Sequence, residues 1–268
     1  MTAATAYAGK LALITGAGDG IGAMLARGFA SWGMQICVAD IRQDAAETVA
    51  DEIGNGAFPL VFDISDREAC LAAAQQLKER GLPITILWAN AGAGLAGSLL
   101  SGNPKTIEWG FAVNVLGLIW TAQAFVPLLA GDATSHVGFT ASTASLRPPP
   151  AHMPLYPVTK HAGFAAADAL KAELAEKDIA STILFPGLLN TNIWNGARAR
   201  PDRFGGPRET DPSISGYWTE AKSPELMWPH IARTVLDGGG YLTCETESAT
   251  AEAIASRADL LVNSITQI

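Results

Sequence analysis

The chain has few charged residues, and its shortage of basic residues excludes some classes of partner. Charged side chains make up 16% of the 268 residues, and 18 Lys and Arg against 26 Asp and Glu give a net charge of −8. Nucleic acids and anionic membrane surfaces both attract basic proteins. We therefore expect a protein that binds neither nucleic acid nor a membrane. A charged share this low favours a chain that covers part of its surface with further copies of itself, so we also expect a homo-oligomer.

Cysteine is scarce, and its spacing fits neither a disulfide framework nor a zinc site. Cys37, Cys70 and Cys244 lie far apart, and the chain contains no C-x-x-C pair and no H-E-x-x-H. We expect no bound metal and no disulfides. The most apolar stretch, residues 113–130, is interrupted by Asn, Gly, Thr, Gln and Pro, and the first ten residues lack a signal core. These features favour a cytoplasmic protein without a transmembrane helix.

Short apolar runs alternate with longer segments in which apolar residues recur every three or four positions. Runs that are apolar throughout are typical of parallel strands covered on both faces. The alternation predicts a single α/β domain over residues 1–268, with one mostly parallel seven-stranded sheet and helices on both faces. The predicted strands are residues 11–15, 35–40, 58–63, 84–90, 136–141, 181–185 and 241–244. The predicted helices include residues 21–32, 66–80, 104–129, 157–177 and a last helix within 224–240.

A glycine-rich turn follows the first predicted strand. Residues 16–22 read Gly-Ala-Gly-Asp-Gly-Ile-Gly and lead into a helical pattern. Such a turn lets the backbone approach a pyrophosphate at the start of a helix, where free N–H groups and the helix dipole favour anions. The second strand ends at Asp40, where a carboxylate accepts hydrogen bonds from an adenosine ribose and repels a 2′-phosphate. Asp19 adds negative charge and only Arg42 opposes it, so the turn predicts NAD rather than NADP.

A second chemical signal opens the helix that follows a proline-rich loop. Tyr156 and Lys160 are four residues apart, which places both side chains on one helical face. A nearby cation lowers the pKa of a phenol toward working pH, as proton transfer requires. Thr140-Ala-Ser-Thr143 ends the preceding strand and brings hydroxyl groups to the edge of the sheet where ligands bind. Residues 192–223 lack periodicity, and a loop this long is typically a lid or disordered.

Together these motifs resemble the short-chain dehydrogenase/reductase family over nearly the whole chain, which implies a Rossmann-like fold. The resemblance assigns Tyr156 as general acid/base, Ser142 as the group that orients the substrate oxygen, and Lys160 as the cation that lowers the Tyr156 pKa and holds the nicotinamide ribose. Asn114 is expected to kink its helix and support a proton relay. Ser142 precedes Tyr156 by one residue more than is usual, so Thr143 competes for the hydroxyl role, and we favour Ser142.

The resemblance also implies a cofactor site that extends along the carboxyl edge of the sheet. Asn90 is expected to support the sheet behind the cofactor. Asp63 contacts the adenine region or serves only as a turn or N-cap residue, and both alternatives stay open. The expected cofactor residues are Gly16, Asp19, Gly20, Ile21, Gly22, Asp40, Asp63, Ile64, Asn90, Ala91, Gly92, Tyr156, Lys160, Pro186, Gly187, Leu189 and Thr191.

The expected function is NAD-dependent interconversion of a secondary alcohol and a ketone by a dimer or tetramer. A substrate lid is expected at about residues 188–223, and its apolar and aromatic residues favour a bulky small-molecule substrate. The expected substrate residues are Ser142, Met153, Leu155, Tyr156, Leu188 and Trp194. The alternatives are a protein that binds the dinucleotide without turnover, and a reductase of C=C, C=N or sugar substrates.

Overall fold

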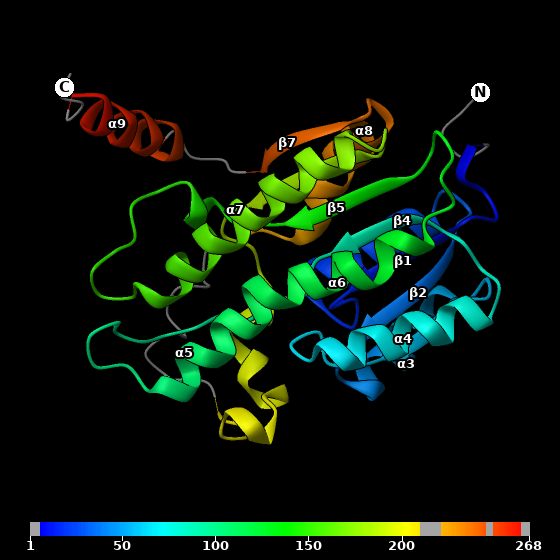
Figure 1. The fold of residues 1–268 in the computed structure, drawn as a ribbon, viewed down its shortest axis with the longest axis horizontal. Coiled ribbons are helices and arrows are strands. Elements are labelled where there is room, and N and C mark those ends of the chain that lie inside the picture. The colour runs from blue at the N-terminus through cyan, green and yellow to red at the C-terminus, as the bar shows by residue number, and fades with distance from the viewer. Residues whose placement is uncertain (1–5, 210–220, 245–248, 264–268) are drawn as a thin grey trace.

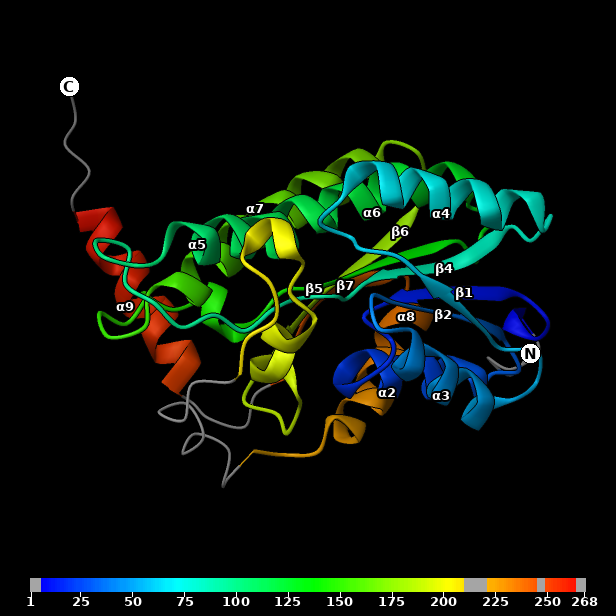
Figure 2. The ribbon, with the colours of Figure 1, turned by 90° about the horizontal axis from the view of Figure 1, so that it is seen from below.

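The computed structural model describes residues 6–209, 221–244 and 249–263, and a single parallel sheet forms their centre. The strand order is β3-β2-β1-β4-β5-β6-β7, with helices on both faces (Figures 1 and 2). The predicted doubly wound α/β sheet is therefore confirmed. The strands are β1 (Leu11–Thr15), β2 (Gln35–Asp40), β3 (Phe58–Val61), β4 (Ile84–Ala89), β5 (His136–Thr140), β6 (Ala180–Pro186) and β7 (Gly239–Cys244).

The central strands are buried on both faces, which is why their sequences are apolar throughout. Every residue of β1, β4 and β5 is buried. One apolar core lies between the sheet and α4, α6 and α7, and the other lies between the sheet and α2, α3 and α8 (Figure 2). The helices are α2 (Gly20–Ala30), α3 (Gln43–Ile53), α4 (Arg67–Glu79), α5 (Pro104–Phe111), α6 (Gly117–Phe125), α7 (Leu155–Ala175), α8 (Trp228–Leu236) and α9 (Ala249–Asn263).

The long helical run before β5 changes its geometry in the middle. Between α5 and α6 lies a π-helical segment, Ala112–Leu116, and a 3-10 turn, Val126–Leu128, follows α6. The whole run Pro104–Leu128 is long and apolar enough to span a membrane by those measures, but 44% of its most apolar window is buried within the protein. It also packs on α4 and α7, as the core helix of a globular domain does.

Two helices differ from the expectation. The helix α7, which carries Tyr156 and Lys160, begins at Leu155, so Pro157 is its third residue rather than its first. Proline is still tolerated there because the first four N–H groups of a helix have no partner within it. The helix within residues 224–240 is α8, but it is not the last one, because α9 follows β7 and extends away from the sheet (Figure 1). The pattern of residues predicts no helix after residue 244, whereas the structure has α9 there.

The strand order brings the chemical motifs together. β1 lies between β2 and β4, so the chain winds outward in opposite directions from the two sides of β1. In open parallel sheets such a switch point leaves a crevice at the carboxyl ends of the strands, where ligands bind. The glycine-rich turn after β1, Asp40 at the end of β2, Asn90 after β4 and Ser142 after β5 all lie at this edge.

Candidate active site

The glycine-rich turn after β1 is shaped by close backbone contacts. Gly16 has a φ of +65°, and a Cβ added there would lie 2.8 Å from the Cα of Ala91. A Cβ added at Gly22 would lie 2.0 Å from the carbonyl oxygen of Gly16. Side chains at these positions would push the turn away from its neighbours. The turn therefore depends on glycine both for its conformation and for a backbone surface that a ligand can approach closely.

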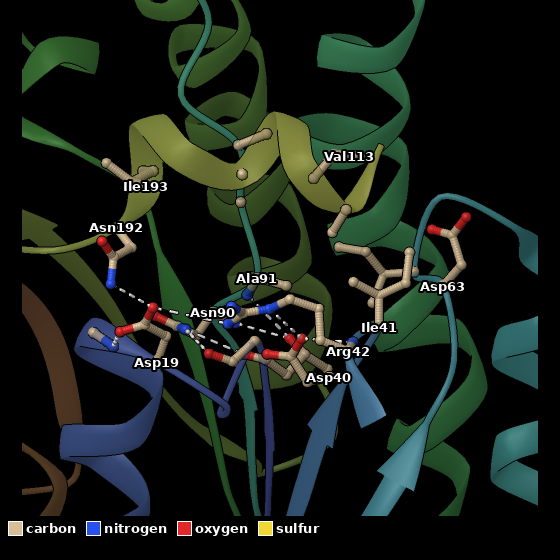
Figure 3. Close-up of a pocket in the computed structure, with 18 of the residues that line it drawn as sticks. Asp19, Asp40, Ile41, Arg42, Asp63, Asn90, Ala91, Val113, Asn192 and Ile193 are labelled. Carbon is tan, nitrogen blue, oxygen red and sulfur yellow. Dashed lines mark hydrogen bonds and ion pairs between the residues drawn. The ribbon is translucent and has the colours of Figure 1, made fainter. Parts of the chain in front are cut away.

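Carboxylates surround the start of α2. Asp19 is the N-cap residue, and its side chain accepts a hydrogen bond from the Gly20 N–H. The Asp40 carboxylate accepts hydrogen bonds from the backbone N–H groups of Gly18, at 3.0 Å, and Arg42, at 2.9 Å. The Arg42 guanidinium lies 3.6 Å from Asp40 and 3.8 Å from Asp19 (Figure 3). Two fixed negative charges and one basic side chain thus meet where an adenosine ribose was expected.

A cavity of about 330 Å³ lies between this edge of the sheet and the segment after β6 (Figure 3). Eleven of the expected cofactor residues line it, whereas Gly22, Tyr156, Lys160, Pro186, Gly187 and Leu189 do not. The eleven are Gly16, Asp19, Gly20, Ile21, Asp40, Asp63, Ile64, Asn90, Ala91, Gly92 and Thr191. Leu189 is instead buried in the core on the α2 side of the sheet.

Asn90 forms hydrogen bonds that link strand ends at the cavity. Its side-chain amide donates to the carbonyl of Thr15 at 3.0 Å, and its Oδ1 accepts from the Thr140 hydroxyl at 3.0 Å. The Thr15 hydroxyl in turn accepts from the backbone N–H groups of Asn90 and Ala91. These bonds join the carboxyl ends of β1, β4 and β5. The supporting role expected for Asn90 agrees with this arrangement.

Asp63 forms a turn and an ion pair. Its Oδ1 accepts hydrogen bonds from the backbone N–H and the hydroxyl of Ser65. Its Oδ2 lies 2.5 Å from Nη2 of Arg203, a residue of the segment that crosses above the cavity. Asp66, rather than Asp63, is the N-cap residue of α4. The turn role of Asp63 is therefore present, and its side chain still lines the cavity.

The expected catalytic side chains meet where α7 begins beside the end of β5. The Ser142 hydroxyl lies close enough to Tyr156 to lower the pKa of the phenol, and Lys160 donates to the carbonyl of Thr140 at 3.3 Å. Thr143 is buried and accepts a hydrogen bond from Arg147 instead. The structure therefore brings Ser142, not Thr143, to the phenol. A Cβ on Gly92 would lie 3.3 Å from Nζ of Lys160, so the ammonium borders a glycine that lines the cavity.

Burial controls the ionisation of this pair. It raises the pKa of Tyr156 from 10.0 to about 12, while the hydrogen bond to Ser142 acts in the opposite direction. It lowers the pKa of Lys160 from 10.5 to about 8. Burial is the largest cause of the Tyr156 shift. The Lys160 ammonium lies 6.0 Å from the centre of the Tyr156 ring.

Asn114 forms hydrogen bonds that link α7 to the loop after β4. It lies within the π-helical segment, and this irregular segment agrees with the kink that was expected in its helix. Its Oδ1 accepts from the Ala93 N–H at 2.8 Å, and its Nδ2 donates to the Ala93 carbonyl and the Thr159 hydroxyl, both at 2.9 Å. A Cβ on Gly163 would lie 2.6 Å from the Asn114 carbonyl, so α7 packs closely on this backbone. Asn114 thus orients two walls of the site.

Trp194 covers the phenol on the side that faces the crossing segment. The Trp194 and Tyr156 ring centres are 5.2 Å apart. A Cβ on Gly94 would lie 2.8 Å from the indole, and the Gly94 N–H donates to the carbonyl of Ile193 at 3.0 Å. Of the other expected substrate residues, Leu155 is buried and packs against Tyr156, whereas Leu188 is 49% exposed. Trp194 and Leu155 therefore adjoin the phenol, whereas Leu188 is largely open to solvent.

Several residues of the site carried no readable signal in the sequence. Trp109 and Val113 line the cavity from the helix that contains Asn114, and Ala93 anchors Asn114. Each of them reads as an ordinary apolar core residue. The crossing segment adds Asn192, Ile193, Asn195, Gly196, Arg198, Ala199 and Pro201 to the lining. Part of the expected lid, including Tyr217 and Trp218, lies outside the described residues.

Comparison with known protein families agrees with this geometry. Residues 10–202 match the family model described as short chain dehydrogenase. The chain is 34% identical over 192 residues to estradiol 17-beta-dehydrogenase 11 of Mus musculus, covering 69% of this chain and 64% of the relative. It thus spans less than two thirds of that relative. Galactitol 2-dehydrogenase (L-tagatose-forming) of Cereibacter sphaeroides is 32% identical, with 73% of this chain and 78% of the relative covered.

Solved structures share the fold over almost the full length. A short chain dehydrogenase/reductase from Burkholderia phymatum in complex with NAD superimposes with a TM-score of 0.85, at 24% identity over 98% of this chain and 97% of the other. A 3-ketoacyl-(acyl-carrier-protein) reductase from Brucella melitensis complexed with NADH gives 0.70, at 26% identity over 88% and 96%. The match of the family model to most of the chain, together with this fold, shows that the protein belongs to the short-chain dehydrogenase family of oxidoreductases.

Proposed function

We propose that the protein is an NAD-dependent oxidoreductase that interconverts a secondary alcohol and a ketone, with a bulky apolar or aromatic substrate. The observation that carries this proposal is the meeting of Ser142, Tyr156 and Lys160 beside Gly92, which lines the cavity of the glycine-rich turn. A proton donor and a dinucleotide cradle at one edge of the sheet are what alcohol–ketone chemistry needs. The names of the mouse and Cereibacter relatives, which refer to estradiol and galactitol, support the same reaction type.

The residues present fit a dinucleotide. The start of α2 offers backbone N–H groups to a pyrophosphate, and the close packing at Gly16 and Gly22 leaves the turn free of side chains. When bound, the nicotinamide supplies or accepts the hydride. Gly16, Gly20, Ile21, Asn90 and Ala91 would hold the cofactor within the cavity.

The proposed preference for NAD rests on charge. Asp40 has an exposed fraction of only 8%, and its carboxylate is held by two backbone N–H groups, so it cannot swing away from the cavity. Asp19 places a second carboxylate within 3.8 Å of Arg42. A 2′-phosphate here would meet two carboxylates and one guanidinium that they already engage, whereas a 2′-hydroxyl would find an acceptor.

The chain's own residues would handle the proton. Tyr156, with a pKa raised to about 12, is protonated at neutral pH and can donate to a ketone oxygen. Ser142 would hydrogen-bond that oxygen and orient it toward the phenol. For alcohol oxidation the phenolate is needed, and the Lys160 ammonium and the Ser142 hydroxyl are the two groups that favour it. Asn114 would hold α7 and the loop after β4 in fixed positions while the proton is transferred.

Apolar side chains border the phenol, which supports a bulky apolar or aromatic substrate. Trp194 and Leu155 lie against Tyr156, while Trp109 and Val113 line the neighbouring part of the cavity. Sites of this composition bury apolar ligands and use a few polar groups to orient them. The polar groups here are the Ser142 and Tyr156 hydroxyls.

A single substitution tests the proposal. Tyr156→Phe removes the proton donor and leaves the cavity lining intact, so turnover of a secondary alcohol with NAD should fall by about 100-fold or more. The NADH dissociation constant, measured by fluorescence titration, should change less than about three-fold, because the phenol does not line the cavity. The matched control is Tyr241→Phe on β7, which removes a phenol that also lies outside the cavity lining and should retain activity.

Two results would count against the proposal. Near-normal turnover by Tyr156→Phe would refute the catalytic role of the phenol. NADH binding without turnover of any alcohol or ketone by the unaltered protein would favour a non-catalytic dinucleotide-binding protein.

A further inference from the structure

One segment crosses the cofactor cavity from one end to the other. Residues 191–204, here called the strap, leave the sheet after β6 and run above the carboxyl edge as two short 3-10 turns (Figure 3). At one end, Nδ2 of Asn192 donates to Oδ2 of Asp19 at 2.8 Å, beside the glycine-rich turn. At the other end, Arg203 pairs with Asp63 after β3. The strap therefore spans the cavity between two carboxylates of the nucleotide-binding half.

The middle of the strap is anchored by a buried arginine. Arg200 is 2% exposed, its guanidinium lies 5.5 Å from the Trp109 ring centre, and Nη1 donates to the Thr106 hydroxyl at 3.1 Å. Its Nη2 donates to the carbonyl of Phe204. These contacts hold the strap on α5, and breaking them would expose buried surface. Arg200 is thus a fixed anchor rather than a group that opens and closes.

The Arg203 contact has the opposite character. Nη2 of Arg203 lies 2.5 Å from Oδ2 of Asp63 and 2.9 Å from the Ser65 hydroxyl. The Arg203 side chain is 44% exposed, while that of Asp63 is only 17% exposed. Because Asp63 Oδ1 is already held by Ser65, the carboxylate presents Oδ2 to the strap in a fixed direction. An ion pair between an exposed guanidinium and a fixed carboxylate can break and re-form without disturbing the core.

We propose that Arg203 is a positioning residue that closes the strap over the adenosine end of the bound dinucleotide and thereby sets the rate of cofactor release. The proposal rests on the proposed function, since it assumes that the cavity holds a dinucleotide. The cavity is lined on one side by Asp40, Asp63 and Ile64 and on the other by strap residues up to Pro201. The adenosine end cannot leave past the strap while Arg203 holds Asp63. Arg203 touches no reacting group, so the chemical step does not depend on it.

The test measures NADH release directly. NADH is bound to the full chain and displaced by excess NAD in a stopped-flow fluorimeter, first with the unaltered protein and then with Arg203→Ala. Exposed ion pairs change equilibrium constants by up to about five-fold, and the second acceptor on Ser65 adds to this, so release should accelerate about 3- to 10-fold. Raising the salt concentration should accelerate release from the unaltered protein more than from Arg203→Ala, because salt screens the exposed pair.

Two further variants separate the effect of the Arg203–Asp63 ion pair from general effects of charge. Arg208→Ala removes the same charge from the neighbouring exposed chain, but the ion pair with Asp63 is formed by Arg203, so this variant should leave release unchanged. Arg203→Lys keeps the charge and should restore slow release in part. Single-turnover reduction by preloaded enzyme should be alike in all of these proteins, since Arg203 lies outside the reacting groups.

The outcomes distinguish this proposal from the one on which it rests. Unaltered protein that binds no NADH would overturn the proposed function. Protein that binds NADH, but whose release is the same in Arg203→Ala and the unaltered chain, would overturn the role of Arg203 alone. A loss of NADP binding in Arg203→Ala without any change in NADH release would also overturn it, because Arg203 would then be reading a 2′-phosphate.

Discussion

Lys160 should make the protein less stable at neutral pH, and its replacement by Met tests this directly. The ammonium is 4% exposed and has one hydrogen-bond acceptor, the Thr140 carbonyl at 3.3 Å. No carboxylate of the described residues forms an ion pair with it. Burial lowers its pKa from 10.5 to about 8. That difference corresponds to about 3 kcal/mol of unfavourable free energy for the charged form in the folded state.

The destabilisation caused by the charge of Lys160 depends on pH in a defined direction. Below pH 8 the side chain is charged in both the folded and unfolded states, so the full destabilisation is present. Between pH 8 and 10.5 the unfolded chain binds more protons than the folded chain, so the free energy of unfolding rises with pH. Above about pH 10 the raised pKa of Tyr156 acts in the opposite direction, because the unfolded phenol then loses its proton first. The measurement therefore belongs between about pH 7 and 9.5.

Lys160→Met keeps an unbranched side chain, shorter by the terminal amino group, and removes its charge. Loss of the hydrogen bond to Thr140 takes away about 1 kcal/mol, so we expect the free energy of unfolding at about pH 7 to increase by about 2 kcal/mol. Urea unfolding followed by circular dichroism gives this quantity. The unaltered protein should become more stable from about pH 7 to 9.5 relative to Lys160→Met. Catalytic activity should fall in the same variant, which would show that the site keeps a destabilising group for its chemistry.

The matched control lies on the same helix. Lys171 also donates to a backbone carbonyl, that of Ser181 at 3.4 Å, but it is only partly buried. Lys171→Met should change the free energy of unfolding by less than about 1 kcal/mol. The reasoning would be refuted if Lys160→Met were less stable than the unaltered protein at neutral pH, or if both lysine variants showed the same pH dependence.

Two further predictions concern the polar framework of the site. Asn114→Ala removes three hydrogen bonds and leaves the buried N–H and carbonyl of Ala93 without partners, so the free energy of unfolding should fall by about 2–4 kcal/mol in urea titrations. Thr159→Val removes only one of these bonds and should have a smaller effect. Equal effects of the two substitutions would contradict the role given to Asn114. Asp40→Asn removes the charge and keeps an oxygen acceptor for only one of the N–H groups of Gly18 and Arg42, which bind different oxygens of the carboxylate. The ratio of kcat/KM with NADP to that with NAD should rise about ten-fold or more; an unchanged ratio would show that Asp40 does not contact the ribose.

The regular elements of the sheet could be predicted because their signal is local. The predicted ends of β1 and β2 agree with the structure, and the other strands differ by no more than two residues at either end. Buried parallel strands must be apolar throughout, so their sequences stand out between helices. The glycine-rich turn, Asp40 and the Tyr156–Lys160 spacing could likewise be read, because strand ends and helix periodicity place them without knowledge of the rest of the chain. The helix α9 and the start of α7 at Leu155 were not predicted correctly, since neither has a strong local boundary signal.

Sequence alone was enough to predict the parallel sheet, the glycine-rich turn after its first strand, and the side chains proposed to transfer a proton. The folded structure shows that Ser142 rather than Thr143 lies near the phenol, and that burial raises the Tyr156 pKa while lowering that of Lys160. It also decided that Arg203 crosses 140 positions of sequence to meet Asp63. Periodicity and spacing report on neighbours along one element. Hydration and long-range ion pairs depend on which elements lie against one another, and that is established only when the chain has folded.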